Sequence, residues 1–246
     1  MSDLDLSAYD ADVVEHALFG LCRARMLDDR FHGMRWNVDL AAGQLVVGDE
    51  MHRIAVVGTY AHASKTFLWA WENPQAVGWG RSLEGTMALR SRGKIPGQSV
   101  YSESNVSADW VDARELAHVA GEVSGGHPVY SADTGSAIAY LLVTDVRLNP
   151  QEISIAYLPG VLLDFASFAK VEQRPCAERL LVRLGFTLEQ RKEKSIVATR
   201  ARDSSHLVVE FAPEGRITHV NFAGGPSAPT GKSKLGKLAA LFSRSR

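Results

Sequence analysis

The stretch TFLWAWENP, residues 66–74, decides the fold of the N-terminal half of the chain. Its aromatic residues alternate with other side chains, and a period of two places Phe67, Trp69 and Trp71 on one face of a β-strand. The strand ends before Pro74, because proline has no N–H to donate to a ladder. Three large aromatic side chains on one face form either the seam of a hydrophobic core or the floor of a recognition surface.

This aromatic strand is predicted to be the second strand of a hairpin. Residues 54–61 form an apolar strand that pairs with residues 66–72 through a four-residue connection. In this register Gly58 faces Trp69 across the ladder, and a glycine there lets the indole lie over bare backbone.

The remaining periodicities predict further helices and antiparallel strands. Asp10 or Asp12 caps a first helix that runs to about Asp29, and Ser107 or Asp109 caps a later helix. Other helices are expected at residues 83–92, 158–169 and 175–184, and other strands at residues 34–40, 44–47, 129–132, 137–146, 186–191, 194–202, 206–211 and 216–222.

These elements predict an α+β fold made of two units and a tail. Residues 9–148 form an antiparallel sheet with three helices on one face, and residues 151–223 form a smaller C-terminal unit of helix and antiparallel β-meander. Asn149-Pro150 marks the boundary between them. Residues 224–246 contain five basic residues and no acidic one, and they are expected to form a basic, disordered tail.

The composition excludes several classes of protein. The chain has 246 residues, of which 46% are apolar and 22% charged, and a formal net charge of −1 argues against a dedicated nucleic-acid binder. Two isolated cysteines, Cys22 and Cys176, suit a reducing compartment. The N-terminal segment is acidic, and no apolar run approaches the roughly 20 residues of a membrane span. We therefore expect a cytoplasmic protein.

The N-terminal half also resembles a known family. Residues 36–40 (WNVDL) match a W-x-x-D-L strand, residues 66–73 match a T-[WF]-L-W-A-W-x-N strand, and residues 110–121 and 130–143 match a helix and a tyrosine-bearing hairpin. Over residues 9–148 the chain thus resembles a family of uncharacterised bacterial proteins, a domain of unknown function. The resemblance implies a fold and a bacterial source, and it implies no reaction.

No pattern of reactive residues assigns a catalytic, cofactor-binding or metal-ligating residue. The eight histidines form no H-E-x-x-H motif, and no cysteine pair has the spacing of a zinc site. The candidate nucleophile is Cys176, which lies in the first turn of a predicted helix where the dipole lowers a thiol pKa. His206 or His219 could be its base. The competing interpretation, a buried structural thiol, is favoured.

The aromatic stretch supplies the candidate binding surface. Trp69, Trp71, Glu72, Asn73 and Trp79 lie near a strand end, where they could rim a concave surface for a peptide or a small ligand. The competing interpretation is that the aromatic side chains pack under the helices of the layer above.

The leading functional hypothesis is a non-catalytic protein- or ligand-binding module of the bacterial cytoplasm, chaperone- or immunity-like, with no cofactor. Because edge strands must be covered or paired, a homodimer is a further expectation. One alternative is a hydrolase-type enzyme that uses Cys176 or acidic residues near Trp71. Another is tethering to a membrane surface or to nucleic acid through the basic tail.

Overall fold

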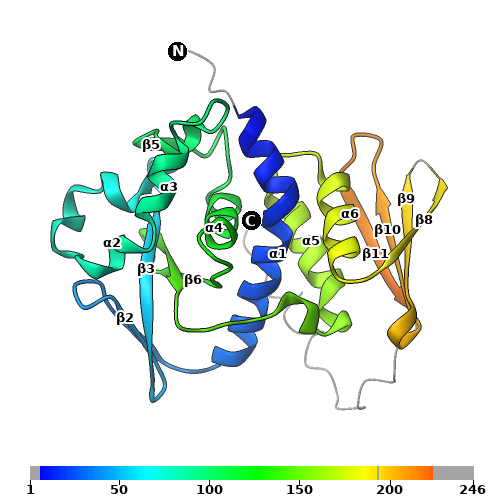
Figure 1. The fold of residues 1–246 in the computed structure, drawn as a ribbon, viewed down its shortest axis with the longest axis horizontal. Coiled ribbons are helices and arrows are strands. Elements are labelled where there is room, and N and C mark those ends of the chain that lie inside the picture. The colour runs from blue at the N-terminus through cyan, green and yellow to red at the C-terminus, as the bar shows by residue number, and fades with distance from the viewer. Residues whose placement is uncertain (1–5, 193, 224–246) are drawn as a thin grey trace.

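Two antiparallel sheets enclose several layers of helices. The computed structural model describes residues 6–192 and 194–223, and Figure 1 shows α1 passing through the middle of the molecule between the two sheets. The α-helices are α1 (Ser7–Phe31), α2 (Arg81–Glu84), α3 (Met87–Arg92), α4 (Ala113–Val123), α5 (Leu158–Phe168) and α6 (Gln173–Arg183). The strands are β1 (Trp36–Asp39), β2 (Gln44–Val47), β3 (Glu50–Ala61), β4 (Thr66–Trp69), β5 (Asn105–Ser107), β6 (Val129–Asp133), β7 (Ala137–Val143), β8 (Thr187–Lys192), β9 (Ser195–Arg200), β10 (Ser205–Phe211) and β11 (Ile217–Ala223). The predicted α+β class with antiparallel sheets is confirmed.

The long strand β3 organises the first sheet. Along one edge, residues 54–61 pair with β7, and β7 pairs in turn with β6. The opposite edge is divided, because residues 50–53 pair with β2 and residues 58–61 pair with β4. Residues 54–58 are all buried, so the middle of β3 has a core on both faces.

A short helical segment closes the gap between β2 and β4. The N–H of Ile54 donates to the C=O of Gly43 at 2.9 Å, and the C=O of Val56 accepts from the hydroxyl of Thr86 at 3.0 Å. Thr86 follows α2 and is fully buried. The Thr86 hydroxyl therefore supplies the hydrogen bond that a neighbouring strand would otherwise donate to Val56 at this edge. A buried carbonyl without such a partner would cost free energy.

The aromatic strand has its predicted partner and a shorter length. Gly58 pairs with Trp69, and a Cβ at Gly58 would lie 2.4 Å from the Phe67 ring and 2.5 Å from a backbone carbonyl. The strand does not continue to residue 72, since Ala70–Glu72 form a 3-10 helix. Trp71 still stacks on Trp69, with ring centroids 4.7 Å apart and an interplanar angle of 11°.

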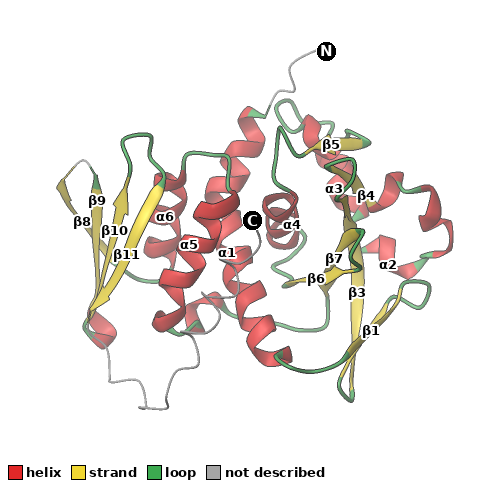
Figure 2. Cartoon of the chain, turned by 180° about the vertical axis from the view of Figure 1, so that it is seen from behind, coloured by secondary structure: helices red, strands yellow, loops and turns green. Residues whose placement is uncertain are grey.

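Helix α1 is shared by both halves of the molecule. Helix α4 packs on one side of it, and α5 and α6 pack on the other (Figures 1 and 2). Gly20 lets α4 come close, because a Cβ there would lie 2.5 Å from the C=O of His118. On the other side, the Arg183 guanidinium lies 3.6 Å from the centre of the Phe19 ring. A single cluster of buried residues consequently joins the first sheet, α1 and the second sheet.

The C-terminal unit is the predicted helix and β-meander. Its strands lie in the order β11-β10-β9-β8, and one face of this sheet packs on α5 and α6 (Figure 2). The layers on the two sides of Asn149-Pro150 share one core. The division into two units, residues 9–148 and 151–223, therefore stays a prediction. Residues 224–246, the predicted tail, lie outside the described residues.

The start of α1 differs from the prediction. The helix begins at Ser7, before the proposed caps Asp10 and Asp12. Asp12 is used in a tertiary contact, since its carboxylate accepts two hydrogen bonds from the Arg92 guanidinium at 3.0 and 2.7 Å. Capping rules cannot predict such a contact, because they consider only neighbours in sequence.

The later helices also differ in their limits. The cap of α4 is Asp112, whose carboxylate accepts from the N–H of Arg114 at 2.8 Å, and neither Ser107 nor Asp109 has this role. The helix predicted over residues 83–92 is divided into α2 and α3. Of these, α2 lies on the side of β3 opposite to α4 (Figure 1), so the first sheet is covered on both sides.

Substitution of Gly58 tests the packing of the aromatic strand. We expect Gly58→Ala to lower the free energy of unfolding by about 2–3 kcal/mol, because the added methyl overlaps the Phe67 ring and a backbone carbonyl. Gly160→Ala is the matched control. It lies in α5 with nothing within 4 Å of the new Cβ, and it should stabilise the helix by up to about 1 kcal/mol. Urea denaturation measures both, and an unchanged midpoint for Gly58→Ala would contradict the packing.

Candidate functional site

The aromatic stretch lies mostly in the core. Trp69 is fully buried, and its indole N–H donates to the C=O of Val100 at 2.9 Å. Phe67 is buried beside it, with ring centroids 4.9 Å apart, and Trp71 is half-buried against the other face of the Trp69 indole. Packing therefore accounts for Phe67 and Trp69, whose side chains a ligand could reach only after a rearrangement.

The other residues of the predicted aromatic surface have separate local contacts. Glu72 forms an ion pair with an arginine of α3 at 3.0 Å, and the Asn73 side chain accepts a hydrogen bond from the backbone two residues later at 2.9 Å. Trp79 packs against the smaller of the two hydrophobic clusters, whereas Trp71 packs against the larger one. A binding role for the exposed parts of these side chains stays a prediction.

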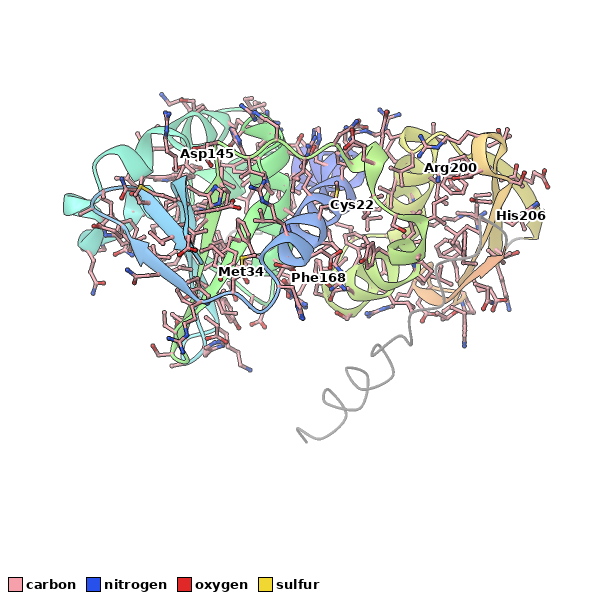
Figure 3. The ribbon with its side chains drawn as sticks, turned by 90° about the horizontal axis from the view of Figure 1, so that it is seen from below. Cys22, Met34, Asp145, Phe168, Arg200 and His206 are labelled. Atoms are coloured by element: carbon pink, nitrogen blue, oxygen red, sulfur yellow. The ribbon has the colours of Figure 1, made fainter. Side chains whose placement is uncertain are left out.

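Both cysteines are buried thiols. Burial raises the pKa of Cys22 and of Cys176 to about 12, which agrees with the favoured interpretation of Cys176 as a buried structural thiol and not with the lowered pKa of the alternative. Desolvation of the thiolate outweighs the helix dipole. The histidines proposed as its base, His206 and His219, are exposed on the face of the second sheet that points away from α6. Figure 3 shows His206 at the far end of this sheet.

A cleft of about 800 Å³ lies beside the first half of β3. Strands β2 and β3, the segment after α2, the loop after α4 and the end of β7 all contribute to it. Its polar lining consists of Gln44, Arg53, His127, Thr144 and Asp145. This volume is in the range of clefts that hold small ligands.

The residues after β7 fix the polar side of the cleft. The N–H of Thr144 donates to the C=O of Arg53 at 2.9 Å, and Oδ2 of Asp145 accepts from the N–H of Arg53 at 3.0 Å. These bonds extend the β3–β7 ladder past Val143, so they hold the backbone of Arg53 in place. Among the residues that the structure describes, no carboxylate pairs with the Arg53 guanidinium.

A histidine behind the cleft holds the second oxygen of Asp145. His52 is 6% exposed and packs on the Phe31 ring, with centroids 5.2 Å apart. Its Nδ1 lies 3.4 Å from Oδ1 of Asp145, and its Nε2 lies 3.2 Å from Oε2 of Glu50. One oxygen of Asp145 thus accepts a hydrogen bond from the backbone of Arg53, and the other faces the His52 ring.

His127 lines the cleft, and a contact with Arg147 fixes the tautomer of its ring. Its Nδ1 lies 3.1 Å from Nη1 of Arg147. A guanidinium can only donate, so Nδ1 is the acceptor and the ring proton is on Nε2. Burial, with Arg147 and Arg23 nearby, lowers the pKa of His127 below its ordinary value, and the ring is therefore neutral at pH 7.

The polar lining of the cleft is suited to binding a ligand, and it offers more hydrogen-bond donors than free acceptors. Arg53, Gln44 and His127 all line the cleft, and Gln44 and Arg53 are paired across the β2–β3 ladder, whereas the Asp145 carboxylate already accepts from the Arg53 N–H. Sequence reasoning missed this cleft because its lining comes from segments up to about a hundred residues apart and forms no motif. The one local signal was the Gly-Gly-His-Pro turn at residues 125–128, which is typical of many loops.

Glu115 is a buried carboxyl in the shared core. It is 1% exposed and accepts hydrogen bonds from the Tyr9 hydroxyl and the Lys170 N–H, both at 3.3 Å. Burial raises the pKa of Glu115 to about 7, although the bond from Lys170 opposes this shift. Because Glu115 joins α1, α4 and the α5–α6 connection, its titration acts on stability and not on the cleft.

The comparisons with known proteins cover the half of the chain that contains the cleft. Residues 11–146 match a family of unknown function, DUF6882. The chain belongs to this family. The predicted resemblance to a domain of unknown function is thereby confirmed, and the matched range includes every residue that lines the cleft. No curated protein and no solved structure matches the chain.

Alkylation tests the state of Cys176. A pKa of about 12 in place of 9.0 leaves roughly a thousandfold less thiolate at pH 7. We therefore expect iodoacetamide to label Cys176 in the folded protein at least about a thousandfold more slowly than a free model thiol, as followed by peptide mass spectrometry. The urea-unfolded protein is the control, in which both cysteines should react freely. Labelling of folded Cys176 at the rate of the model thiol would support the hydrolase alternative.

Glu115 makes stability fall as pH rises. Its pKa is about 7 when folded against an ordinary value of 4.5, so between these values the folded state holds a proton that the unfolded chain releases. The free energy of unfolding should decrease by up to about 3 kcal/mol across this interval. Glu115→Gln removes the decrease, and the variant should be the more stable protein at pH 7.5 in urea denaturation.

Two comparisons isolate the contribution of Glu115. Asp28, whose pKa burial raises to about 6, adds the same slope to wild type and variant. The exposed Glu214 supplies the control substitution Glu214→Gln, which should leave the profile unchanged. Parallel stability profiles for wild type and Glu115→Gln between pH 4.5 and 7.5 would contradict the assignment.

Proposed function

We propose that this member of DUF6882 is a non-catalytic ligand-binding module and that the cleft beside β3 is its binding site. The observation that carries the proposal is Arg53, which lines a cleft of about 800 Å³ and whose guanidinium has no ion pair among the described residues. Met51, 62% exposed, and the buried Ala55 add apolar surface to the lining. A few convergent polar groups in a partly apolar cleft are typical of sites for small ligands.

The hydrolase alternative has less support than binding. A thiol with a pKa near 12 is a poor nucleophile at neutral pH. Glu72, the acidic residue next to Trp71, is committed to an ion pair with Arg90.

The cytoplasm of a bacterium is the proposed setting. This part of the proposal rests on the neutral composition and on the two isolated cysteines, both of which are buried as free thiols. No helix in the described part of the chain is long and apolar enough to cross a membrane.

A protein partner or a second copy of the chain is a further proposal, for a chaperone- or immunity-like role. Its support is the outer edge of β1, which pairs with no other strand of the described residues, and the exposed side chains of Met34 and Trp36 there, 46% and 43% exposed. An open strand edge beside exposed apolar side chains favours association. Tethering through residues 224–246 concerns a segment outside the described residues.

A fragment screen with a blocked variant tests the cleft. Gln44→Trp places a large side chain in the lining, and Thr199→Trp adds the same side chain to the second sheet as a control. We expect ligand-observed NMR to find fragments that bind wild type and Thr199→Trp and that lose binding to a correctly folded Gln44→Trp. The proposal is wrong if no fragment binds, or if the fragments bind Gln44→Trp as well as they bind wild type.

A further inference from the structure

We infer that the ligand of the cleft is a small organic anion, a carboxylate with a short apolar body. The inference rests on the proposed function and adds the chemical class of the ligand. It depends on three features of the lining: the placement of its donors, the engagement of its acceptor and the position of its apolar surface.

The donors stand next to each other on one face of the sheet. Gln44 and Arg53 are directly paired across the β2–β3 ladder, so their side chains point to the same face with their Cβ atoms about 5 Å apart. A guanidinium beside a side-chain amide matches the two oxygens of a carboxylate, because the planar fork of arginine binds such groups through parallel hydrogen bonds. His127 lines the cleft on the side of the loop after α4.

The acceptor in the cleft is already engaged. Asp145 accepts from the Arg53 N–H at 3.0 Å, and its other oxygen lies 3.4 Å from the Nδ1 of His52. A cationic ligand would have to compete with these contacts and would meet the Arg53 charge as well. An anion leaves the contacts of Asp145 intact and supplies the partner that the Arg53 guanidinium lacks among the described residues. The balance of contacts therefore favours a negative ligand.

The apolar surface limits what is attached to the carboxylate. Met51 is exposed over the outer part of the cleft, and Ala55 is buried at its inner side. Gly85 packs directly on Ala55 there, since a Cβ added at Gly85 would lie 2.8 Å from the Cβ of Ala55. A short aliphatic or aromatic body on the carboxylate would lie against Met51, because burial of apolar surface contributes about 25 cal/mol per Å².

The test compares three probes with a short aliphatic chain and a different charge, of which butyrate and butyramide have the same shape. Butyrate, butyramide and butylammonium are titrated into the full-length protein, and ¹⁵N–¹H NMR follows the amides of Gln44, Gly85 and Thr144. We expect butyrate to shift these amides at the lowest concentration. Arg53→Gln should weaken butyrate binding at least about tenfold, which is the effect of losing a charge-assisted hydrogen bond. Lys194→Gln removes an exposed positive charge on the second sheet and should leave the affinity unchanged.

The outcomes separate the ligand class from the site. If butyramide or butylammonium binds at these amides as tightly as butyrate, or if Arg53→Gln leaves butyrate binding unchanged, the anion assignment is overturned and the cleft remains a binding site. If neither these probes nor any fragment of the library shifts the cleft amides, the proposed function is overturned together with the ligand class.

Discussion

The rest of the structure depends on the packing of α1 between layers on both of its sides. Residues 17–22 are all buried, and a run longer than one helical turn without an exposed residue means that the helix is covered all round. Gly20 admits α4 at van der Waals distance, and on the other side Arg179 and Arg183 bind Glu15, while Arg183 also covers Phe19. The two sheets never meet, and α1 is the element that places one relative to the other.

The cleft follows from the way the first sheet is completed. β2 leaves β3 before β4 begins, so backbone groups at this edge need partners from outside the sheet. Gly43 and Thr86 supply them, and Asp145 does the same for Arg53 at the opposite edge. The segments that satisfy these groups stand around β3 and enclose the space between them. Residues that serve the backbone of the sheet thus also define a concave site.

Local patterns predicted what depends on neighbours in sequence. The hairpin of β3 and β4, with Gly58 opposite Trp69, follows from alternation and turn length, and the second meander follows in the same way. The failures concern tertiary contacts. The place of Cys176 at the start of α6 would by itself lower the thiol pKa, whereas burial raises it. Asp12 is bound by Arg92 instead of capping α1. The cleft could not be predicted, because topology alone brings its segments together.

The sharing of α1 has a consequence for synthesis on the ribosome. Helix α1 is complete at Phe31, but α4 ends at Val123 and α6 at Arg183. At about 5–20 residues per second, the ribosome needs roughly 10–30 s to produce the last helix that covers the second side of α1. During that interval the apolar side chains of residues 17–22 lack the helices that cover them in the finished protein. Charged residues along α1, such as Glu15 and Arg23, likewise wait for their partners on α6 and α4.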